Sequence, residues 1–169
     1  IQGLRGPGAP LAILGLNSIL LLAALGQQRG AIRRMYELLA PGGIVAVDVW
    51  QPDADDLARF DGRVSLEWLR RDPESGRDVA KLAAAWLDAP NRLVTLTTIF
   101  DEAEPGAAPT RWTRSDALRL IGPDELREHA EEAGFEVEMV AGDYDLTPFG
   151  SGSDRAILIG RRPGPARTP

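Results

Sequence analysis

Two short, uninterrupted apolar segments with a helical segment between them constrain the fold of this chain more than any other feature. Residues 11–16 and 44–49 are typical of strands buried on both faces. Residues 19–40 predict a helix, broken near Gly26 or Gly30, and Pro41-Gly42-Gly43 predicts the turn that ends it. A strand, a helix and a second strand in this order predict a right-handed βαβ unit of a parallel sheet.

The middle of the chain has a different pattern. From residue 61 to 120, turn signals such as Asp72-Pro73 and Pro105-Gly106 recur at intervals of about ten residues. Residues 93–100 are strongly β in composition, whereas the alanine-rich residues 79–87 fit a strand or a helix. We predict an antiparallel meander inserted into the parallel sheet as a lid.

The last part of the chain returns to an α/β pattern. Pro123 and two acidic residues open a helix that Gly134 ends, with His129 on its polar, solvent-facing side. Strands are predicted at 135–140 and 156–159, joined by a loop. The expected organisation is an α/β core at 1–60 and 121–163, a β insertion at 61–120 and a tail at 164–169.

Composition excludes several functions. The 19 basic and 25 acidic side chains give a net charge of -6, which argues against a protein that binds nucleic acid by neutralising phosphates. The chain has no cysteine and one histidine, so disulfides, thiolate zinc sites and multi-histidine metal sites are excluded. We therefore expect no metal and a small-molecule substrate.

The apolar character of residues 11–25 raises the question of a membrane or export segment. The run is shorter than the ~20 apolar residues of a membrane helix, and Gly15, Asn17 and Ser18 interrupt it. A signal-peptide core is the alternative. A buried strand followed by a helix explains the run better, so we expect a cytoplasmic protein without membrane contact.

Four stretches together resemble a known family. Residues 38–48, which read Leu-Leu-Ala-Pro-Gly-Gly-Ile-Val-Ala-Val-Asp, are the most specific; the others are residues 11–18, 132–137 and 142–155. In this order they resemble the C-terminal portion of class I S-adenosylmethionine-dependent methyltransferases of small molecules. The meander resembles the β insertion that covers the substrate site in some of these enzymes. The implied fold is a partial Rossmann-like methyltransferase sheet with an antiparallel β insertion.

The cofactor loop of that family is missing from the sequence. No apolar strand precedes Gly3, Gly6 and Gly8, and prolines interrupt this Gly-rich stretch. The acidic residue that binds the ribose hydroxyls is missing as well. The resemblance therefore implies a fragment that, taken alone, binds S-adenosylmethionine weakly and is inactive.

The resemblance also implies a set of site residues at the carboxyl ends of the strands, where ligands of open α/β sheets bind. The cofactor-binding residues would be Leu16, Asn17 and Ser18; the catalytic residues Asp48 and Tyr144; the substrate-binding residues Trp50, Arg111, Trp112 and Asp145. Structural roles are open for three of them: Asn17 as a helix cap, Asp48 as a cap or the partner of an arginine, and Trp50 as packing.

Other residues have competing interpretations. The aromatic residues Trp68, Trp86, Phe100 and Trp112 line one substrate pocket or form the core of the inserted sheet. Arg111 and Arg114 recognise an acidic substrate or lie on a solvated strand. Arg155 is expected to form a surface ion pair with Asp154.

Methyl transfer to a small-molecule acceptor is the function that these residues and motifs favour. The alternative is a non-catalytic α/β module that pairs with another chain, or with itself, through an exposed sheet edge. A different Rossmann-like enzyme, such as an oxidoreductase, has no support because its nucleotide-binding motif is also missing.

Overall fold

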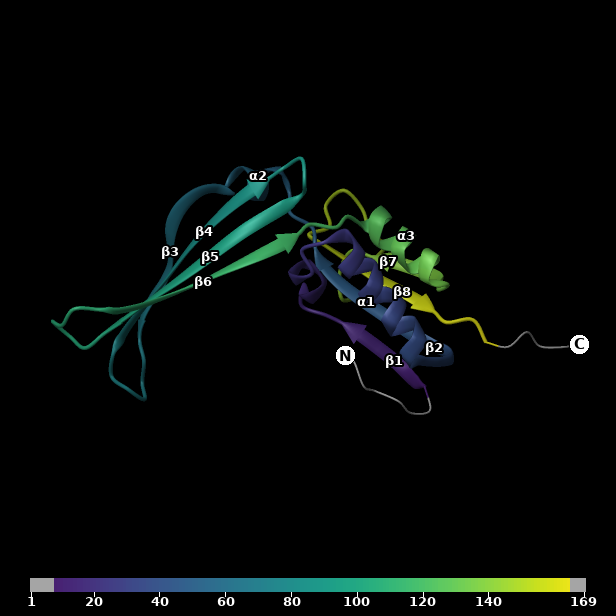
Figure 1. Ribbon diagram of the computed structural model, residues 1–169, viewed down its shortest axis with the longest axis horizontal. Helices are drawn as coiled ribbons and strands as arrows, with labels where there is room; N and C mark the ends of the chain where they lie inside the picture. The colour runs from purple at the N-terminus through teal and green to yellow at the C-terminus, as the bar shows by residue number, and fades with distance from the viewer. Residues whose placement is uncertain (1–7, 165–169) are drawn as a thin grey trace, which may run out of the picture. The chain divides into compact units, whose positions relative to one another are not determined.

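The computed structural model describes residues 8–164, which form two compact units (Figure 1). One unit comprises the described residues up to Asp53 and from Arg119 onward, and the other is Ala54–Leu118. Gly3 and Gly6 of the Gly-rich stretch lie outside the described residues, as does the tail after Gly164. The first unit carries the α/β core and the second the β insertion.

A four-stranded sheet forms the centre of the first unit. Its strands are β1 (Ala9–Leu14), β2 (Leu39–Trp50), β7 (Glu136–Ala141) and β8 (Arg155–Arg161), in the order β1-β2-β8-β7. β1 and β2 are parallel, which confirms the predicted βαβ unit, and β8 is antiparallel to both of its neighbours. β1 forms one edge of this sheet.

The predicted first helix is interrupted. A 3-10 turn at Ser18–Leu21 precedes α1 (Leu25–Leu38), so the break comes just before Gly26. α3 (Pro123–Ala133) begins at the predicted proline and ends at Gly134, whose φ of 101° suits a residue without Cβ. Among the described helices, none has both the length and the apolar character needed to cross a bilayer.

The Pro-Gly-Gly segment does not form the expected turn outside the strand. β2 already begins at Leu39 and includes Pro41, Gly42 and Gly43. The Gly42 N–H donates to the carbonyl of Arg162, and the Arg162 N–H donates to the carbonyl of Gly43, both at 2.8 Å. The expectation is wrong because the backbone of Arg162, far along the chain, supplies hydrogen-bond partners that keep Gly42 and Gly43 within the strand.

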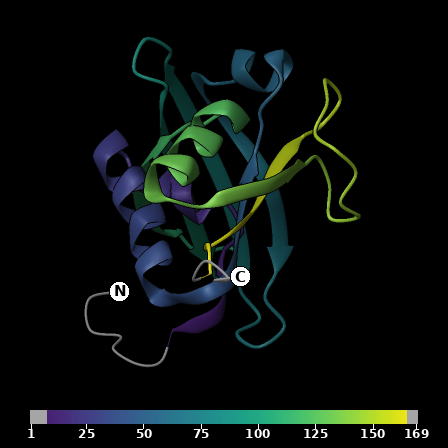
Figure 2. The same cartoon turned by 90° about the vertical axis from the view of Figure 1, so that its right-hand side faces the viewer.

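The hydrophobic core lies on one face of the sheet. Val45, Val47 and Val49 of β2 are fully buried, as are Ala156 and Leu158 beside them on β8. α1 packs against β1 and β2, α3 packs against β7 and β8, and the two helices contact each other, so both cover this face (Figure 2). Alternate side chains of the strands therefore point away from the helices.

The other face of the sheet is partly open in the described structure. Leu11 and Ile13 of β1 are 51% and 66% exposed. Register places Leu11 beside Ile44 and Ile13 beside Ala46, so Asp48 follows on the same face toward the end of β2. The carboxylate of Asp48 thus projects from the face opposite the helices.

The second unit is an antiparallel meander, as predicted. After a short helix, α2 (Ala54–Ala58), which the sequence pattern did not predict, come β3 (Asp61–Arg71), β4 (Asp78–Asp88), β5 (Leu93–Ala103) and β6 (Thr110–Arg119). The strands pair in chain order. The ambiguous alanine-rich residues 79–87 form a strand because β3 and β5 bond to both of its edges.

The four aromatic side chains of the insertion do not share one pocket. Phe100 lies opposite Lys81, contacts Trp68 edge-on at 6.1 Å and stacks on Trp112 at 5.7 Å between ring centroids. Trp86 is five residues from Lys81 along β4, so it projects from the opposite face. One face therefore holds an aromatic cluster of three, and Trp86 lies outside it.

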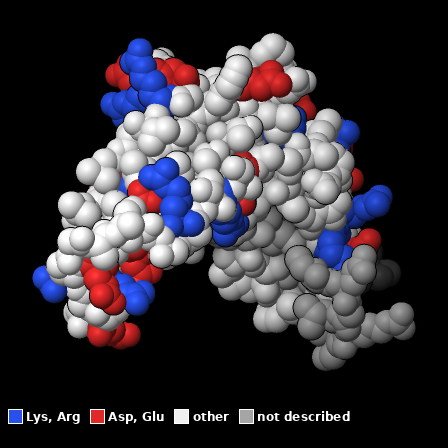
Figure 3. Space-filling model, turned by 60° about the vertical axis from the view of Figure 1, so that its left-hand side comes forward, with Lys and Arg blue, Asp and Glu red and all other residues white. Residues whose placement is uncertain are grey.

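Basic side chains of the inserted sheet form ion pairs with acidic side chains of the same sheet. Arg111 makes a two-pronged contact with Asp101 at 2.6 Å, and Arg114 bonds Asp116 at 2.8 Å. Figure 3 shows basic and acidic side chains in adjacent groups on the visible face rather than a patch of one sign. Both arginines are engaged by carboxylates of the sheet itself.

Candidate active site

The parallel strands β1 and β2 end at the same edge of the sheet, and this brings two predicted site residues together. Leu14 pairs with Val47, so the residues after β1 lie beside the end of β2. The Trp50 N–H donates to Oδ1 of Asn17 at 2.7 Å. The Asn17 side chain therefore joins the two strand ends and does not cap the 3-10 turn that follows it.

The backbone at this edge is strained. Leu16 and Asn17 both have positive φ, 54° and 62°, and the Ser18 N–H donates to the carbonyl of Gly15 at 3.2 Å. Two positive-φ residues at the centre of a tight turn usually require glycine or asparagine, so leucine here is costly. The turn places the Leu16 side chain, 85% exposed, at the end of the sheet. Strain of this kind is concentrated at functional sites.

Asp48 is the centre of a compact polar cluster. Its Oδ2 accepts hydrogen bonds from the Leu16 N–H at 3.2 Å and the Tyr144 hydroxyl at 2.9 Å. Its Oδ1 accepts a hydrogen bond from Nη1 of Arg155 at 2.7 Å. With its side chain only 10% exposed, this carboxylate is held by three donors that balance its burial.

Tyr144 and Arg155 complete the cluster. Nη1 of Arg155 also donates to the Tyr144 oxygen at 2.6 Å, and the guanidinium lies 4.4 Å from the centre of the ring. The hydrogen bond to Asp48, with burial and the Asp48 charge, raises the pKa of Tyr144, and Arg155 offsets part of this rise. Tyr144 thus remains a neutral hydrogen-bond donor at neutral pH.

Arg155 is the site residue that the sequence pattern did not reveal. It was expected to pair with Asp154 on the surface, but Nε lies 3.8 Å from that carboxylate, farther than Nη1 lies from Asp48. Arg155 is the first residue of β8 and pairs with Trp50 of β2, which aligns its side chain with the Asp48 face. Only the pairing of β8 with β2 places it there, and no local pattern of the sequence shows that pairing.

Other predicted site residues belong to the second unit or have local roles. The Asp145 carboxylate accepts bonds from the N–H and hydroxyl of Thr147 in its own loop. Arg111 and Trp112 belong to β6 in the second unit. The Ser18 hydroxyl donates to the Gly15 carbonyl at 2.7 Å and so supports the strained turn.

His129 does not lie on a solvated face. It is 1% exposed, packed between α1 and α3, and neither ring nitrogen has a hydrogen-bond partner among the described residues. Burial lowers the pKa of His129 below its ordinary value, against the opposing charge of Glu125. The surface prediction is wrong because α1 covers a helix position that has charged sequence neighbours.

The cluster presents unused donors to a ligand. Asn17 uses its carbonyl oxygen internally, and within residues 8–164 its Nδ2 has no acceptor. Nη2 of Arg155 likewise makes no hydrogen bond inside that part of the chain, while Asp48 is occupied. Together with the exposed Leu16, these groups suit a ligand that has oxygen acceptors and an apolar portion.

Several solved structures that superpose on this chain are methyltransferases. CcbJ from Streptomyces caelestis superposes with a TM-score of 0.71 at 20% identity, over 93% of this chain and 62% of its own. The SAM-bound amino pentose methyltransferase CalS10 from Micromonospora echinaspora gives 0.69 at 19%, over 95% and 61%. The sugar N-methyltransferase KedS8 from a Streptoalloteichus species gives 0.71 at 18%, over 94% and 57%.

These likenesses define the fold class. The chain has the Rossmann-like fold of class I methyltransferases with a β insertion, and it spans about three fifths of the length of the structures it matches. No protein-family model matches it, and no curated protein matches it in sequence.

Proposed function

We propose that this chain provides the acceptor-binding part of an S-adenosylmethionine-dependent methyltransferase of small molecules. The Asp48–Tyr144–Arg155 cluster carries the proposal, because it lies at the carboxyl ends of the strands, where open α/β sheets bind ligands. CalS10 and KedS8 act on an amino pentose and on a sugar nitrogen. A small polyhydroxylated amine is therefore the acceptor class we favour.

Each side chain then has a role. Tyr144 contacts the acceptor as the catalytic residue, with its ring exposed and its hydroxyl fixed between Asp48 and Arg155. Asp48 acts as a positioning residue, since its oxygens are already bonded. Arg155 offers its free Nη2 to an acceptor hydroxyl. Trp50 and the exposed Leu16 offer apolar surface to the acceptor.

The chemistry asks little of these groups beyond alignment. S-adenosylmethionine supplies a methyl group on a positively charged sulfur, and transfer is an in-line displacement. Tyr144 and Arg155 would hold the acceptor amine in line with that methyl group, and the surplus proton of the product would leave to water. Groups that hold a neutral amine in line are sufficient, so a cluster without a free base is adequate.

This chain offers only part of a cofactor site. The strained turn Leu16–Asn17–Ser18 can contact one end of S-adenosylmethionine, but the sequence holds no Gly-rich loop after an apolar strand. We propose that polypeptide outside these 169 residues supplies that loop and adds to the sheet at β1, whose Leu11 and Ile13 are exposed. The chain alone is then expected to be inactive.

Two titrations test this proposal. In calorimetry, the chain alone should not bind S-adenosylhomocysteine tightly; tight binding would contradict the missing loop. In NMR, D-glucosamine should shift the Trp50 indole resonance. Tyr144→Phe and Asp48→Asn should weaken this effect, while the control Tyr36→Phe, far from the cluster, should not. If D-glucosamine shifts other resonances but leaves the Trp50 indole resonance unchanged, the proposed acceptor site is contradicted.

The exposed edge strand also supports a second candidate, a non-catalytic module that pairs through β1. Sedimentation of the chain and of Ile13→Lys would show self-association that the lysine abolishes. The two candidates differ in one result. A partner that restores S-adenosylhomocysteine binding supports the enzyme, and pairing that never restores it supports the module.

A further inference from the structure

A groove between α1 and α3 lies outside the candidate active site. Its volume is about 220 Å³, and it is lined by Gly26, Arg29, Gly30, Arg33, His129, Glu132 and Ala133. None of the residues of the Asp48 cluster lines it. We propose that this groove binds a small phosphate-type anion, either inorganic phosphate or a phosphomonoester.

The start of α1 is prepared for negative charge. The helix begins at Leu25, its first turn has no acidic residue, and Ala24 has no side chain that caps it. The amides of Leu25 and Gly26 have no acceptor among the residues the structure describes. Unpaired N–H groups and the positive end of the helix dipole favour an anion at this position.

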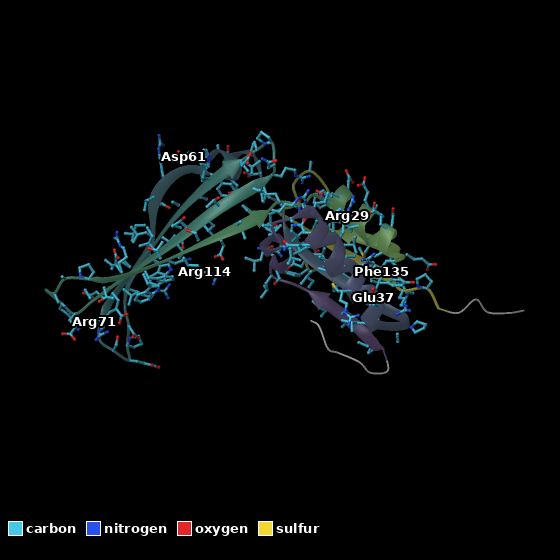
Figure 4. The ribbon with its side chains drawn as sticks, viewed as in Figure 1. Arg29, Glu37, Asp61, Arg71, Arg114 and Phe135 are labelled. Carbon is cyan, nitrogen blue, oxygen red and sulfur yellow. The ribbon has the colours of Figure 1, made fainter. Side chains whose placement is uncertain are left out.

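Two arginines extend this positive region along the same face of α1. Arg29 and Arg33 follow Gly26 at positions three and seven, and Arg29, labelled in Figure 4, points toward α3, where its Nε lies 3.3 Å from Glu132. Arg33 has no ion pair or hydrogen bond within residues 8–164. A Cβ built on Gly26 or Gly30 would meet no atom within 4 Å, so the groove is open beside both glycines.

His129 supplies the second, independent observation. It lines the groove although it is 1% exposed, and both of its ring nitrogens lack partners in the described chain. Nε2 lies 3.8 Å from Glu125, too far for a hydrogen bond. A buried polar group without a partner is costly, and a ligand oxygen that reaches the imidazole N–H would remove this cost.

The balance of charge selects an anion over a cation. Two arginines and the helix terminus oppose the single carboxylate of Glu132 in the groove. A phosphate group has enough acceptor oxygens for several N–H donors at once. Glu132 competes with the ligand for Arg29. Removal of the Glu132 charge should therefore strengthen binding, whereas removal of the Arg33 charge should weaken it.

His129 is the only histidine of the chain, so its ring resonances report on the groove without ambiguity. The experiment titrates inorganic phosphate into the full chain at constant ionic strength, with chloride as the reference anion. We expect a saturable shift of the His129 ring signals. Arg33→Gln should weaken the affinity about fivefold, and Glu132→Gln should strengthen it about threefold.

The control variant is Arg34→Gln, which removes an equal charge next to Arg33 but outside the groove, where Arg34 pairs with Glu37. It should leave the affinity unchanged. Equal shifts with chloride, or equal losses from Arg33→Gln and Arg34→Gln, would overturn the proposal. Tighter binding of glucose 6-phosphate than of phosphate would identify a phosphomonoester, and the reverse order would identify the free ion.

Discussion

The hydroxyl of Tyr144 donates a 2.9 Å hydrogen bond to Oδ2 of Asp48 across 96 positions of the sequence. This contact ties the loop between β7 and β8 to the end of β2, and Arg155 bonds both partners. The three side chains come from separate elements, and only the pairing of β2 with β8 brings them together.

The proton equilibrium of Tyr144 depends on this contact. Because the Asp48 carboxylate favours the neutral phenol, the pKa of Tyr144 is above its ordinary value, and Asp48→Asn should lower it. Ultraviolet absorbance of phenolate against pH, with the Tyr144→Phe spectrum subtracted, measures this pKa. An unchanged or higher pKa in Asp48→Asn would contradict the hydrogen bond.

Gln28 holds a buried polar junction, and its loss should destabilise the chain. It is fully buried; its Nε2 donates to the carbonyls of Ile19 and Arg119, and its Oε1 accepts from Nη1 of Arg119 at 2.6 Å. Gln28→Ala leaves these groups unpaired and should lower the free energy of unfolding by about 2–3 kcal/mol in urea denaturation. The exposed neighbour variant Gln27→Ala should cost at most about 1 kcal/mol; equal losses would argue against the junction.

His129 should make stability depend on pH. Burial lowers its folded-state pKa below 6.5, while Glu125 and Glu132 oppose this shift and Arg29 and Arg119 add to it. Below pH 6.5 the unfolded chain takes up a proton that the folded chain resists. The free energy of unfolding therefore decreases as the pH is lowered, until the pH passes the folded-state pKa.

The variant His129→Leu isolates this contribution, since leucine fills a similar volume and does not titrate. The difference in urea midpoint between the two proteins should be constant above pH 6.5. Below pH 6.5 it should change, because the chain with His129 loses stability relative to His129→Leu. A constant difference over the whole range would contradict the lowered pKa.

Substitution of two glycines by alanine should change the stability of the chain in opposite directions. Gly134 has a φ of 101°, and a Cβ there would lie 3.2 Å from the Tyr36 ring, so Gly134→Ala should destabilise by about 1–2 kcal/mol. Gly30 lies inside α1 with open space around it, so Gly30→Ala should stabilise by about 0.5–1 kcal/mol. Thermal unfolding of both variants measures the contrast, and a stabilising Gly134→Ala would refute it.

Local chemistry explains what could be predicted. The apolar run at 44–49 is typical of a buried strand, and Pro123 with its acidic neighbours is typical of a helix start. Such signals act through neighbouring residues. The alanine-rich strand β4 had no such signal, because alanine fits both structures and only its partner strands decide.

The candidate site shows the same division. The positions of Asn17 and Asp48 near the strand ends were predictable, because Asn17 follows one apolar run and Asp48 lies near the end of the other. Arg155 and the burial of His129 were not, since charged neighbours in the sequence suggested solvent for both.

By itself, the sequence determined the order and type of most elements, because helix caps, turns and apolar periodicity act over a few residues. Tertiary structure decided which side chains meet. The register of β8 on β2 places Arg155 against Asp48, and the packing of α1 on α3 buries His129. Such contacts join residues far apart in the chain, so their energies depend on a geometry that no local pattern contains.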